Sequence, residues 1–337
     1  MSWLDNAAEQ QCDNWRSQGF ERTPATFSTG QTPVATIDGL EYVLFSSSNY
    51  LGLAEHPAVA KAAADALNRF GAGSGGSRLT TGTTDLHAQV ESDFARFLGY
   101  EDSVFFSAGF MANAGVLQAL AGPGTLIVSD ERNHASIIDG CRLAKAQGAT
   151  VRVYRHRDPA HVDELLRGHS GEAIVVTDGL FSMDGTLAPV PELIAVCRAH
   201  GAALMVDDAH GTGTLGATGR GITEHFSLID DHPDILVATS SKALGVEGGA
   251  VAISAPVAAL LRQKARTFVY STSSTPATCA AVSAAIGVLE GDGSPVPALH
   301  RNIRRLASQL GMGDWASPII PVPVSYTHLT LPTILLV

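Results

Sequence analysis

Short apolar runs rich in β-branched residues recur between residues 103 and 238, and each is followed by a polar segment. The runs are SVFF, TLIV, TVRVY, AIVV, ALMV and DILVA, and helical patterns such as GFMANAGVLQALA, ASIIDGCRLAKAQG and VPELIAVCRAHG separate most of them. Continuous rather than alternating apolarity is typical of strands covered on both faces, as in a parallel sheet. The alternation of strands and helices therefore predicts an α/β domain with a mostly parallel, doubly wound sheet.

The chain before this region has a different pattern. Residues 1–18 place apolar side chains near helical spacing, which predicts an amphipathic helix. The segment VATIDGLEYVLFSSS predicts two strands joined by a turn at Asp38-Gly39. His56-Pro57 predicts the start of a helix that ends at Gly71. We therefore expect a helix and a hairpin ahead of the α/β domain.

Length and composition set the expected domain organisation. A chain of 337 residues, 45% hydrophobic and 16% charged, can bury a sizeable core. We predict an N-terminal segment at 1–50, a large domain at 51–290 and the start of a small C-terminal domain at 291–324, where SPIIPVPV resembles a strand. Residues 325–337, SYTHLTLPTILLV, lack helix caps and glycine punctuation and are interpreted as a non-native tail.

Composition also argues against several classes of protein. The net charge is 22 − 33 = −11 and no Lys/Arg cluster occurs, so nucleic acid is not an expected partner. Cys12, Cys141, Cys197 and Cys279 are scattered, as free thiols in a reducing compartment would be. The N-terminus does not resemble a signal peptide, and no apolar run approaches the roughly 18 residues of a membrane span. A cytoplasmic protein without membrane contact is expected.

Polar side chains follow five of the apolar runs at their carboxyl ends. The carboxyl ends of parallel strands meet at one edge of a sheet, and open α/β sheets bind ligands at that edge. We therefore expect one large polar site. The polar residues at these ends are Ser107, Ser129, Asp130, Asn133, His134, Thr177, Asp178, Ser182, Asp207, Asp208, His210, Thr239 and Lys242.

A nicotinamide or flavin dinucleotide is one candidate ligand. The spacing GxGxxG occurs in GAGSGG at 71–76 and in GTGTLG at 211–216. The first copy follows a predicted helix rather than a strand, and Asp-Asp-Ala-His separates the second from its strand. No acid follows about 20 residues later at a second strand end, as a dinucleotide fold requires. The context therefore argues against this ligand.

A metal ion is a second candidate. Asp207, Asp208 and His210 form an oxygen-rich cluster with one imidazole, which could hold a divalent cation. The sequence has no HExxH motif and no second histidine at helical spacing from this cluster. We therefore predict no metal site.

Pyridoxal phosphate is the third candidate, and it explains Lys242. A lysine after a strand is usually a solvated side chain. In a dry cleft, however, burial lowers the pKa of an amine, and a neutral amine forms a Schiff base with an aldehyde such as this cofactor. The cofactor also needs a carboxylate at its ring nitrogen, a helix N-terminus for its phosphate and a flat side chain against its ring. Asp207, residues 107–110 and His134 offer these three groups.

Six motifs together resemble the α-oxoamine synthases, a family of fold-type I pyridoxal-phosphate enzymes. They are SSSNYLGL, GSGGSRLTTGT, NHASIIDG, DGLFSMDG, DDAHGTGTLG and TSSKALG, in this order along the chain. The resemblance implies a fold-type I large domain and the decarboxylative condensation of an amino acid with an acyl thioester. Within the family, SRLTTGTTDLH and FSMDG most resemble members that join L-alanine to pimeloyl-CoA or a pimeloyl-carrier protein.

The resemblance implies a role for each residue of the cofactor ring site. Lys242 would bind the aldehyde and move the Cα proton, and Asp207 would pair with the ring nitrogen. His210 and Ser182 would face the phenolic oxygen. His134 would stack on the ring, assist proton transfer and contact the substrate. Taken alone, Asp207 could be a helix N-cap, Ser182 a turn residue and His134 a structural histidine.

Further matches concern the phosphate and a second subunit. Gly109, Phe110 and Thr239 match the family's phosphate-side residues, although Phe110 could equally belong to the core. Ser271 and Thr272 resemble residues that reach the phosphate of the neighbouring subunit's cofactor. The resemblance thus implies a homodimer with shared active sites, whereas a polar turn before the next helix would also explain YSTS.

The substrate contacts implied by the resemblance rest on fewer residues. Arg22 lies where the family has an arginine near the pimeloyl carboxylate, although in isolation it is a surface charge. Ser48 stands where the family usually has an asparagine that contacts the substrate carboxylate, so Asn49 is expected to substitute for it.

The end of the chain departs from the family. Family members continue past this length, and the arginine with which they hold the amino-acid carboxylate has no counterpart here. We therefore expect a truncated chain that binds the cofactor and turns over poorly. Two alternatives stay open at this stage: a sister synthase such as a 2-amino-3-ketobutyrate CoA ligase or another enzyme of the same fold, and a catalytically impaired cofactor-binding fragment.

Overall fold

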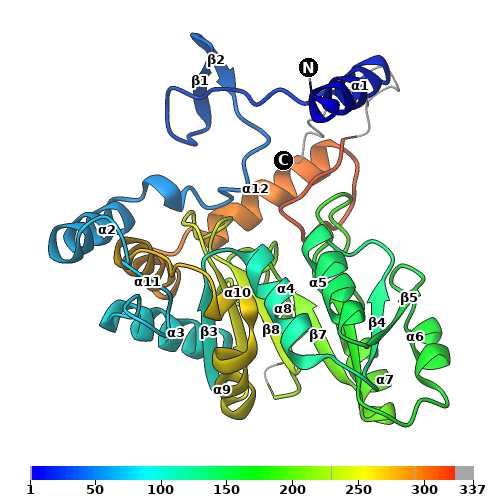
Figure 1. The fold of residues 1–337 in the computed structure, drawn as a ribbon. Helices are drawn as coiled ribbons and strands as arrows, with labels where there is room; N and C mark the ends of the chain where they lie inside the picture. The colour runs from blue at the N-terminus through cyan, green and yellow to red at the C-terminus, as the bar shows by residue number, and fades with distance from the viewer. Residues whose placement is uncertain (1, 229, 292, 323–337) are drawn as a thin grey trace.

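The computed structural model describes residues 2–228, 230–291 and 293–322. Within them, seven strands form the main sheet in the order β3-β9-β8-β7-β6-β4-β5 (Figure 1). The six apolar runs are confirmed as strands of this sheet. Its strands are β3 (Asp102–Phe106), β4 (Leu126–Asp130), β5 (Thr150–Tyr154), β6 (Ala173–Asp178), β7 (Ala203–Asp207), β8 (Ile235–Thr239) and β9 (Gly249–Ile253).

Strand β9 is the one that the sequence pattern did not predict. Strand β9 pairs antiparallel with both β3 and β8. The other neighbouring strands, in the order β8-β7-β6-β4-β5, pair in parallel. The β9 sequence, GAVAI, is short and made mostly of small residues, so it carries a weak strand signal. Because β3 and β8 are both antiparallel to β9, they run in the same direction. The carboxyl ends of β3, β4, β6, β7 and β8 therefore lie at one edge, as expected.

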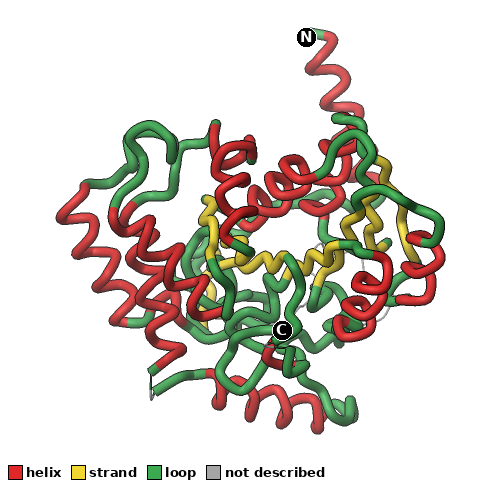
Figure 2. The backbone as a smooth tube through the Cα atoms, turned by 90° about the horizontal axis from the view of Figure 1, so that it is seen from below, coloured by secondary structure: helices red, strands yellow, loops and turns green. Residues whose placement is uncertain are grey.

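Helices cover both faces of this sheet (Figures 1 and 2). Successive residues of a strand point to opposite faces, so Val104 and Phe106 pack in one apolar cluster and Phe105 packs in the other. One cluster includes α4 (Gly109–Leu120), α5 (Ala135–Ala146), α9 (Ala255–Lys264) and α10 (Arg266–Val269). The other includes α2 (Pro57–Phe70), α3 (Asp85–Leu98), α6 (Pro159–Leu166), α7 (Val190–His200) and α11 (Pro276–Glu290). None of the helices in this part of the chain is long and apolar enough to cross a membrane.

The N-terminal helix and hairpin are also confirmed. Helix α1 (Trp3–Ser17) buries none of its residues and projects away from the sheet (Figure 2). Strands β1 (Val34–Ile37) and β2 (Leu40–Val43) pair antiparallel around Asp38 and Gly39, whose φ angles of 51° and 79° form the predicted tight turn.

The strand predicted at the C-terminal end is wrong over residues 317–322, which contain no strand. Helix α12 (Val296–Gln309) precedes this segment. Pro318 and Pro321 lack the N–H groups that a strand ladder requires. The carbonyl of Ile319 instead accepts a hydrogen bond from Trp315 Nε1 at 2.9 Å. The short helices η1 (Leu53–Glu55) and α8 (Ile222–His225) complete the set. The proposed tail at 325–337 lies outside the described residues.

Candidate active site

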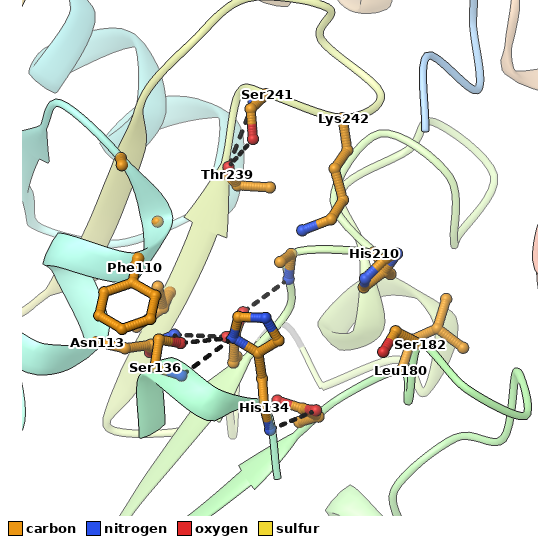
Figure 3. A pocket seen from close by; sticks show the side chains of 16 residues that line it. Phe110, Asn113, His134, Ser136, Leu180, Ser182, His210, Thr239, Ser241 and Lys242 are labelled. Carbon is orange, nitrogen blue, oxygen red and sulfur yellow. Dashed lines mark hydrogen bonds between the residues drawn. The ribbon is translucent and has the colours of Figure 1, made fainter. Parts of the chain in front are cut away.

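A cavity of about 260 Å³ opens at the carboxyl edge of the sheet (Figure 3). Its wall combines ends of β6, β7 and β8 with the first turns of α4 and α5. The structure thus brings together eight of the residues that the sequence singled out. These are Gly109, Phe110, His134, Ser182, Asp207, His210, Thr239 and Lys242.

The amine of Lys242 points into the cavity from the loop after β8 (Figure 3). Burial lowers the pKa of Lys242, and the carboxyl groups of Asp207 and Asp178 partly oppose that shift. The loop turns sharply at Gly245, whose φ is 70°. A Cβ at Gly245 would lie 2.3 Å from the backbone nitrogen of Ala54, so the close approach that shapes this loop requires glycine.

Asp207 presents a buried carboxylate at the end of β7. It is 5% exposed. One oxygen accepts a hydrogen bond from the backbone N–H of Ala209 at 3.0 Å, and the other accepts one from Asn113 Nδ2 at 2.6 Å. Two fixed donors therefore hold the carboxylate in place.

A second carboxyl group in the cavity wall, that of Asp178, was not assigned a role from the sequence. It lies at the end of β6, and its Oδ2 accepts the backbone N–H of His134 at 3.1 Å. Its other oxygen is buried and has no partner among the described residues. Burial, and then the neighbouring Asp207, raise the pKa of Asp178 well above its usual range. The surroundings of Asp178 therefore disfavour its ionised form.

Asp208 fixes the loop that carries His210. Its side chain is fully buried, and its Oδ2 accepts hydrogen bonds from the Ile222 N–H at 3.1 Å and the Thr212 hydroxyl at 3.0 Å. Burial raises the pKa of Asp208 to about 8. A Cβ at Gly221 would lie 1.9 Å from Asp208 Oδ2, so the loop closes around this acid only with glycine there.

We expect Asp208→Asn to make the free energy of unfolding less dependent on pH. In the unfolded chain this carboxyl ionises near its ordinary pKa of 3.8, whereas in the folded protein it keeps its proton until about pH 8. Stability is therefore lost as the pH rises through this window, by at most about 1.4 kcal/mol per pH unit. Asparagine is uncharged at every pH in this window and has nearly the shape of the protonated aspartate. The melting temperature of the variant, relative to that of wild type, should therefore increase as the pH rises.

Thermal unfolding between about pH 5 and pH 8.5 tests this expectation, because that range spans most of the window. Asp139→Asn is the matched control, since Asp139 lies at the surface of α5 and pairs with Arg142 at 2.7 Å. Parallel curves for Asp208→Asn and wild type would contradict the assignment.

His210 is held by a tyrosine from the N-terminal part of the chain. Tyr50 Oη lies 2.8 Å from His210 Nδ1. Burial raises the pKa of Tyr50 to about 12. Burial, and then the neighbouring Lys242 and His134, lower the pKa of His210 well below its usual value. Both partners are therefore neutral near pH 7. The motif SSSNYLGL was noted in the sequence, but nothing in it indicated that Tyr50 reaches a histidine 160 positions later.

His134 caps the N-terminus of α5 at the mouth of the cavity. Its Nδ1 lies 2.7 Å from the hydroxyl of Ser136 and 3.3 Å from the Ser136 backbone nitrogen. The ring meets Phe110 edge-on, with centroids 6.5 Å apart. Phe110 is 47% exposed and belongs to the cavity wall, so the alternative that placed it in the core is wrong.

The end of the cavity nearest α4 has the features of an anion site. Helix α4 begins at Gly109 without a side-chain cap, so its first backbone N–H groups remain available. A Cβ at Gly109 would lie 3.3 Å from Thr239 Oγ1, so glycine keeps this end open. The hydroxyls of Thr239 and Ser241 lie 2.8 Å apart beside it. Ser241 was not singled out from the sequence.

Ser271 and Thr272 do not line this cavity. Thr272 forms an isolated bridge with Ser77. Both residues border a separate small hollow that is also lined by Arg78 and His87. Their expected role across a subunit boundary stays a prediction.

Of the three expected substrate residues, His134 lines the cavity, whereas Arg22 and Asn49 lie elsewhere. Arg22 is exposed, and its guanidinium lies 5.7 Å from the centroid of Trp15. The Asn49 side chain donates to the carbonyl of Gln31 at 3.4 Å and accepts from the backbone N–H of Ala54 at 3.3 Å. Their contacts with a substrate stay predictions.

The side chains of the DDAH cluster point to different surroundings. Asp207 binds Asn113, Asp208 binds the N-terminus of α8, and His210 binds Tyr50. Over residues 2–228, 230–291 and 293–322, no group of three or more His, Cys, Asp and Glu side chains could hold a metal ion.

Comparisons with known proteins point to one family. The family described as aminotransferase class I and II matches residues 41–316. The bifunctional biotin biosynthesis protein BioWF of Corynebacterium kroppenstedtii is 44% identical over 95% of this chain, and the chain spans 50% of that relative's length. The 8-amino-7-oxononanoate synthase of Geobacter sulfurreducens is 47% identical to this chain. The match covers 87% of this chain and 74% of the length of that relative.

A solved structure extends the similarity to the fold. It is a serine palmitoyltransferase from S. paucimobilis with a bound PLP–myriocin aldimine. The match has a TM-score of 0.89 at 29% identity, and it covers 98% of this chain and 88% of the other.

Proposed function

Because the chain belongs to the class I and II aminotransferase family, we propose that it is a pyridoxal-phosphate-dependent acyltransferase that condenses L-alanine with a pimeloyl thioester. The products are 8-amino-7-oxononanoate, carbon dioxide and the free thiol, a step of biotin biosynthesis. One observation carries the proposal: a single cavity holds the amine of Lys242, the buried carboxylate of Asp207 and the open N-terminus of α4.

The residues present fit this cofactor. Pyridoxal phosphate, when bound, supplies an aldehyde that reacts with amines and a protonated ring that withdraws electrons from the amino-acid Cα. Lys242 would hold the aldehyde, and Asp207 the ring nitrogen. Gly109, Thr239 and the α4 N-terminus would hold the phosphate. The remaining contacts would come from His134 on the ring face and from Ser182 and His210 at the phenolic oxygen.

Lys242 acts as the base in this proposal. Burial lowers the pKa of its amine, so a larger share is unprotonated at neutral pH than for an exposed lysine. An unprotonated Nζ accepts the Cα proton of alanine and later returns a proton to the product. The amine points into the cavity from the loop after β8, and this position supports the role (Figure 3).

Asp207 keeps a proton at the ring nitrogen. Its oxygens already accept from Asn113 and Ala209, so the carboxylate is fixed before any ligand enters. A preorganised negative charge of this kind stabilises a positive partner without reorganisation. The Tyr50 hydroxyl can donate to His210 Nδ1, which leaves Nε2–H of His210 to donate into the cavity.

We also propose that two copies share their sites, with Ser271 and Thr272 of one protomer reaching the other's phosphate end. Arg22 and Asn49 would meet the acyl and amino-acid carboxylates in that assembly. The exposed position of Arg22 and the location of Thr272 outside the cavity support a role that involves a second chain.

A sister activity is the second candidate. The match to serine palmitoyltransferase covers 98% of the chain at a TM-score of 0.89, which favours L-serine and a longer acyl thioester. The 47% identity to 8-amino-7-oxononanoate synthase favours L-alanine. The two candidates share the cofactor and differ in the amino acid and in the acyl thioester.

Amino-acid preference separates the candidates. Purified protein with pyridoxal phosphate should exchange the Cα proton of L-alanine in deuterated water and release thiol from pimeloyl-CoA. Glycine should be at least about tenfold poorer, because it lacks the methyl group that the pocket would contact. Proton NMR measures the exchange, and a thiol reagent measures the release. Faster exchange of L-serine with thiol release from palmitoyl-CoA would support the sister activity, and absence of cofactor binding would contradict both.

A further inference from the structure

A continuous chain of hydrogen bonds runs along one wall of the cavity (Figure 3). Asn113 Nδ2 donates to Asp207 Oδ2 at 2.6 Å and also to Ser136 Oγ at 2.9 Å. Ser136 Oγ in turn lies 2.7 Å from His134 Nδ1. Asn113 and Ser136 are 1% and 0% exposed, so water does not compete for the hydrogen bond between them. These hydrogen bonds connect α4, α5 and the end of β7.

The hydrogen bonds of this chain run in one direction. If the Asn113 amide were rotated by half a turn, its oxygen would face the carboxylate oxygen of Asp207 at 2.6 Å, which is repulsive. The amide nitrogen therefore faces Asp207, and its second hydrogen goes to Ser136. Ser136 accepts that hydrogen and donates its own hydroxyl proton to His134 Nδ1. The Ser136 backbone N–H also points at the same Nδ1, at 3.3 Å.

We propose that Asn113 is a positioning residue that links the carboxylate of Asp207 to the tautomer of His134. With two donors aimed at Nδ1, the neutral His134 ring carries its proton on Nε2. Asn113 secures this arrangement because it makes the Ser136 hydroxyl a donor toward the ring. The role toward the cofactor rests on the proposed function. There, the Asn113 amide holds the Asp207 carboxylate and orients the His134 imidazole.

Packing supports a dedicated role for this amide. Asn113 is a buried polar residue on the mostly apolar helix α4, and such a residue is costly unless it is hydrogen-bonded. Helix α5 can reach it because Gly140 faces α4. A Cβ at Gly140 would lie 3.2 Å from Ala114 Cα and 3.2 Å from Asn113 O. Glycine at this position therefore sets the short distance between Asn113 and Ser136.

The tautomer of His134 can be measured without any ligand. The full chain is labelled with ¹⁵N-histidine, and its 12 histidines are separated by ring ¹⁵N shifts, with His134→Gln identifying the signal. Wild type should show the proton on Nε2. Asn113→Ala should raise the share with the proton on Nδ1 by about fivefold, as expected for the loss of one neutral hydrogen bond. Gln118→Ala, at another buried polar position of α4, should leave the signal unchanged.

Combining Asn113→Ala with a second substitution makes the test specific. In Ser136→Ala, which lacks the connecting hydroxyl, Asn113→Ala should add no further change to the His134 signal. An equal change in both backgrounds, or a wild-type proton on Nδ1, would overturn the proposal. If Asn113→Ala does not fold, Gly140→Ala tests the same link, because it moves α5 away from α4.

The same samples separate this inference from the proposed function. Titration with pyridoxal phosphate, followed by absorbance, should give a dissociation constant that Asn113→Ala raises about fivefold through the loosened Asp207. Wild type that fails to bind pyridoxal phosphate would contradict the proposed function, whereas the tautomer measurement would still decide the hydrogen-bond chain.

Discussion

Lys242→Ala is expected to lower kcat for the condensation by about a thousandfold or more, because it removes the only cavity amine in the described residues that can take the Cα proton. The variant should still bind pyridoxal phosphate, since the α4 N-terminus, Thr239 and Asp207 remain. It should lose the covalent attachment that borohydride traps. Thiol release from pimeloyl-CoA measures the first effect, and mass spectrometry of the reduced protein measures the second.

Lys145→Ala is the matched control. Lys145 is exposed on α5, the helix that begins beside the cavity, so its removal should change neither reading. Retention of the borohydride adduct by Lys242→Ala would place the attachment on another amine and remove the basis of the proposed function.

The strand pattern of the sequence predicted the sheet and its ligand-binding edge because local burial determines both. The run ILVA within DILVA is apolar on every residue, and the structure covers both faces of that strand. The position of Lys242 directly after it followed from the same pattern. Strand β9 escaped prediction because GAVAI owes its place to pairing with β3 and β8, which local propensity does not encode.

The residues that support the site could not be found in the same way. Tyr50 reaches His210 across 160 positions, and Asn113 reaches Asp207 across 94. Such contacts depend on the tertiary packing of distant segments, and a single tyrosine in a loop or asparagine in an apolar helix carries no sign of its partner. Asp178 stood at a strand end like Asp207, and only the structure shows the burial beside Asp207 that raises its pKa.

Asp207→Asn is expected to lower kcat at least about a thousandfold and to weaken pyridoxal phosphate binding by about 10- to 100-fold, the range for a lost charged hydrogen bond. Asparagine has nearly the shape of aspartate but no charge, so it cannot keep the ring nitrogen protonated. Asn113 and the Ala209 N–H would also face an amide group where both now donate to carboxylate oxygens. Thiol release and cofactor titration measure the two effects.

Asp178→Asn provides the sharpest comparison, because both carboxyl groups line one cavity but have different hydrogen-bond partners. Burial, and then the neighbouring Asp207, raise the pKa of Asp178, which favours its uncharged form, so an amide is a close substitute and can still accept the His134 N–H. We therefore expect the kcat of Asp178→Asn to fall by no more than about tenfold, against about a thousandfold for Asp207→Asn. Equal losses from the two substitutions would mean that the cavity does not distinguish its acids, and the assignment of Asp207 to the ring nitrogen would be wrong.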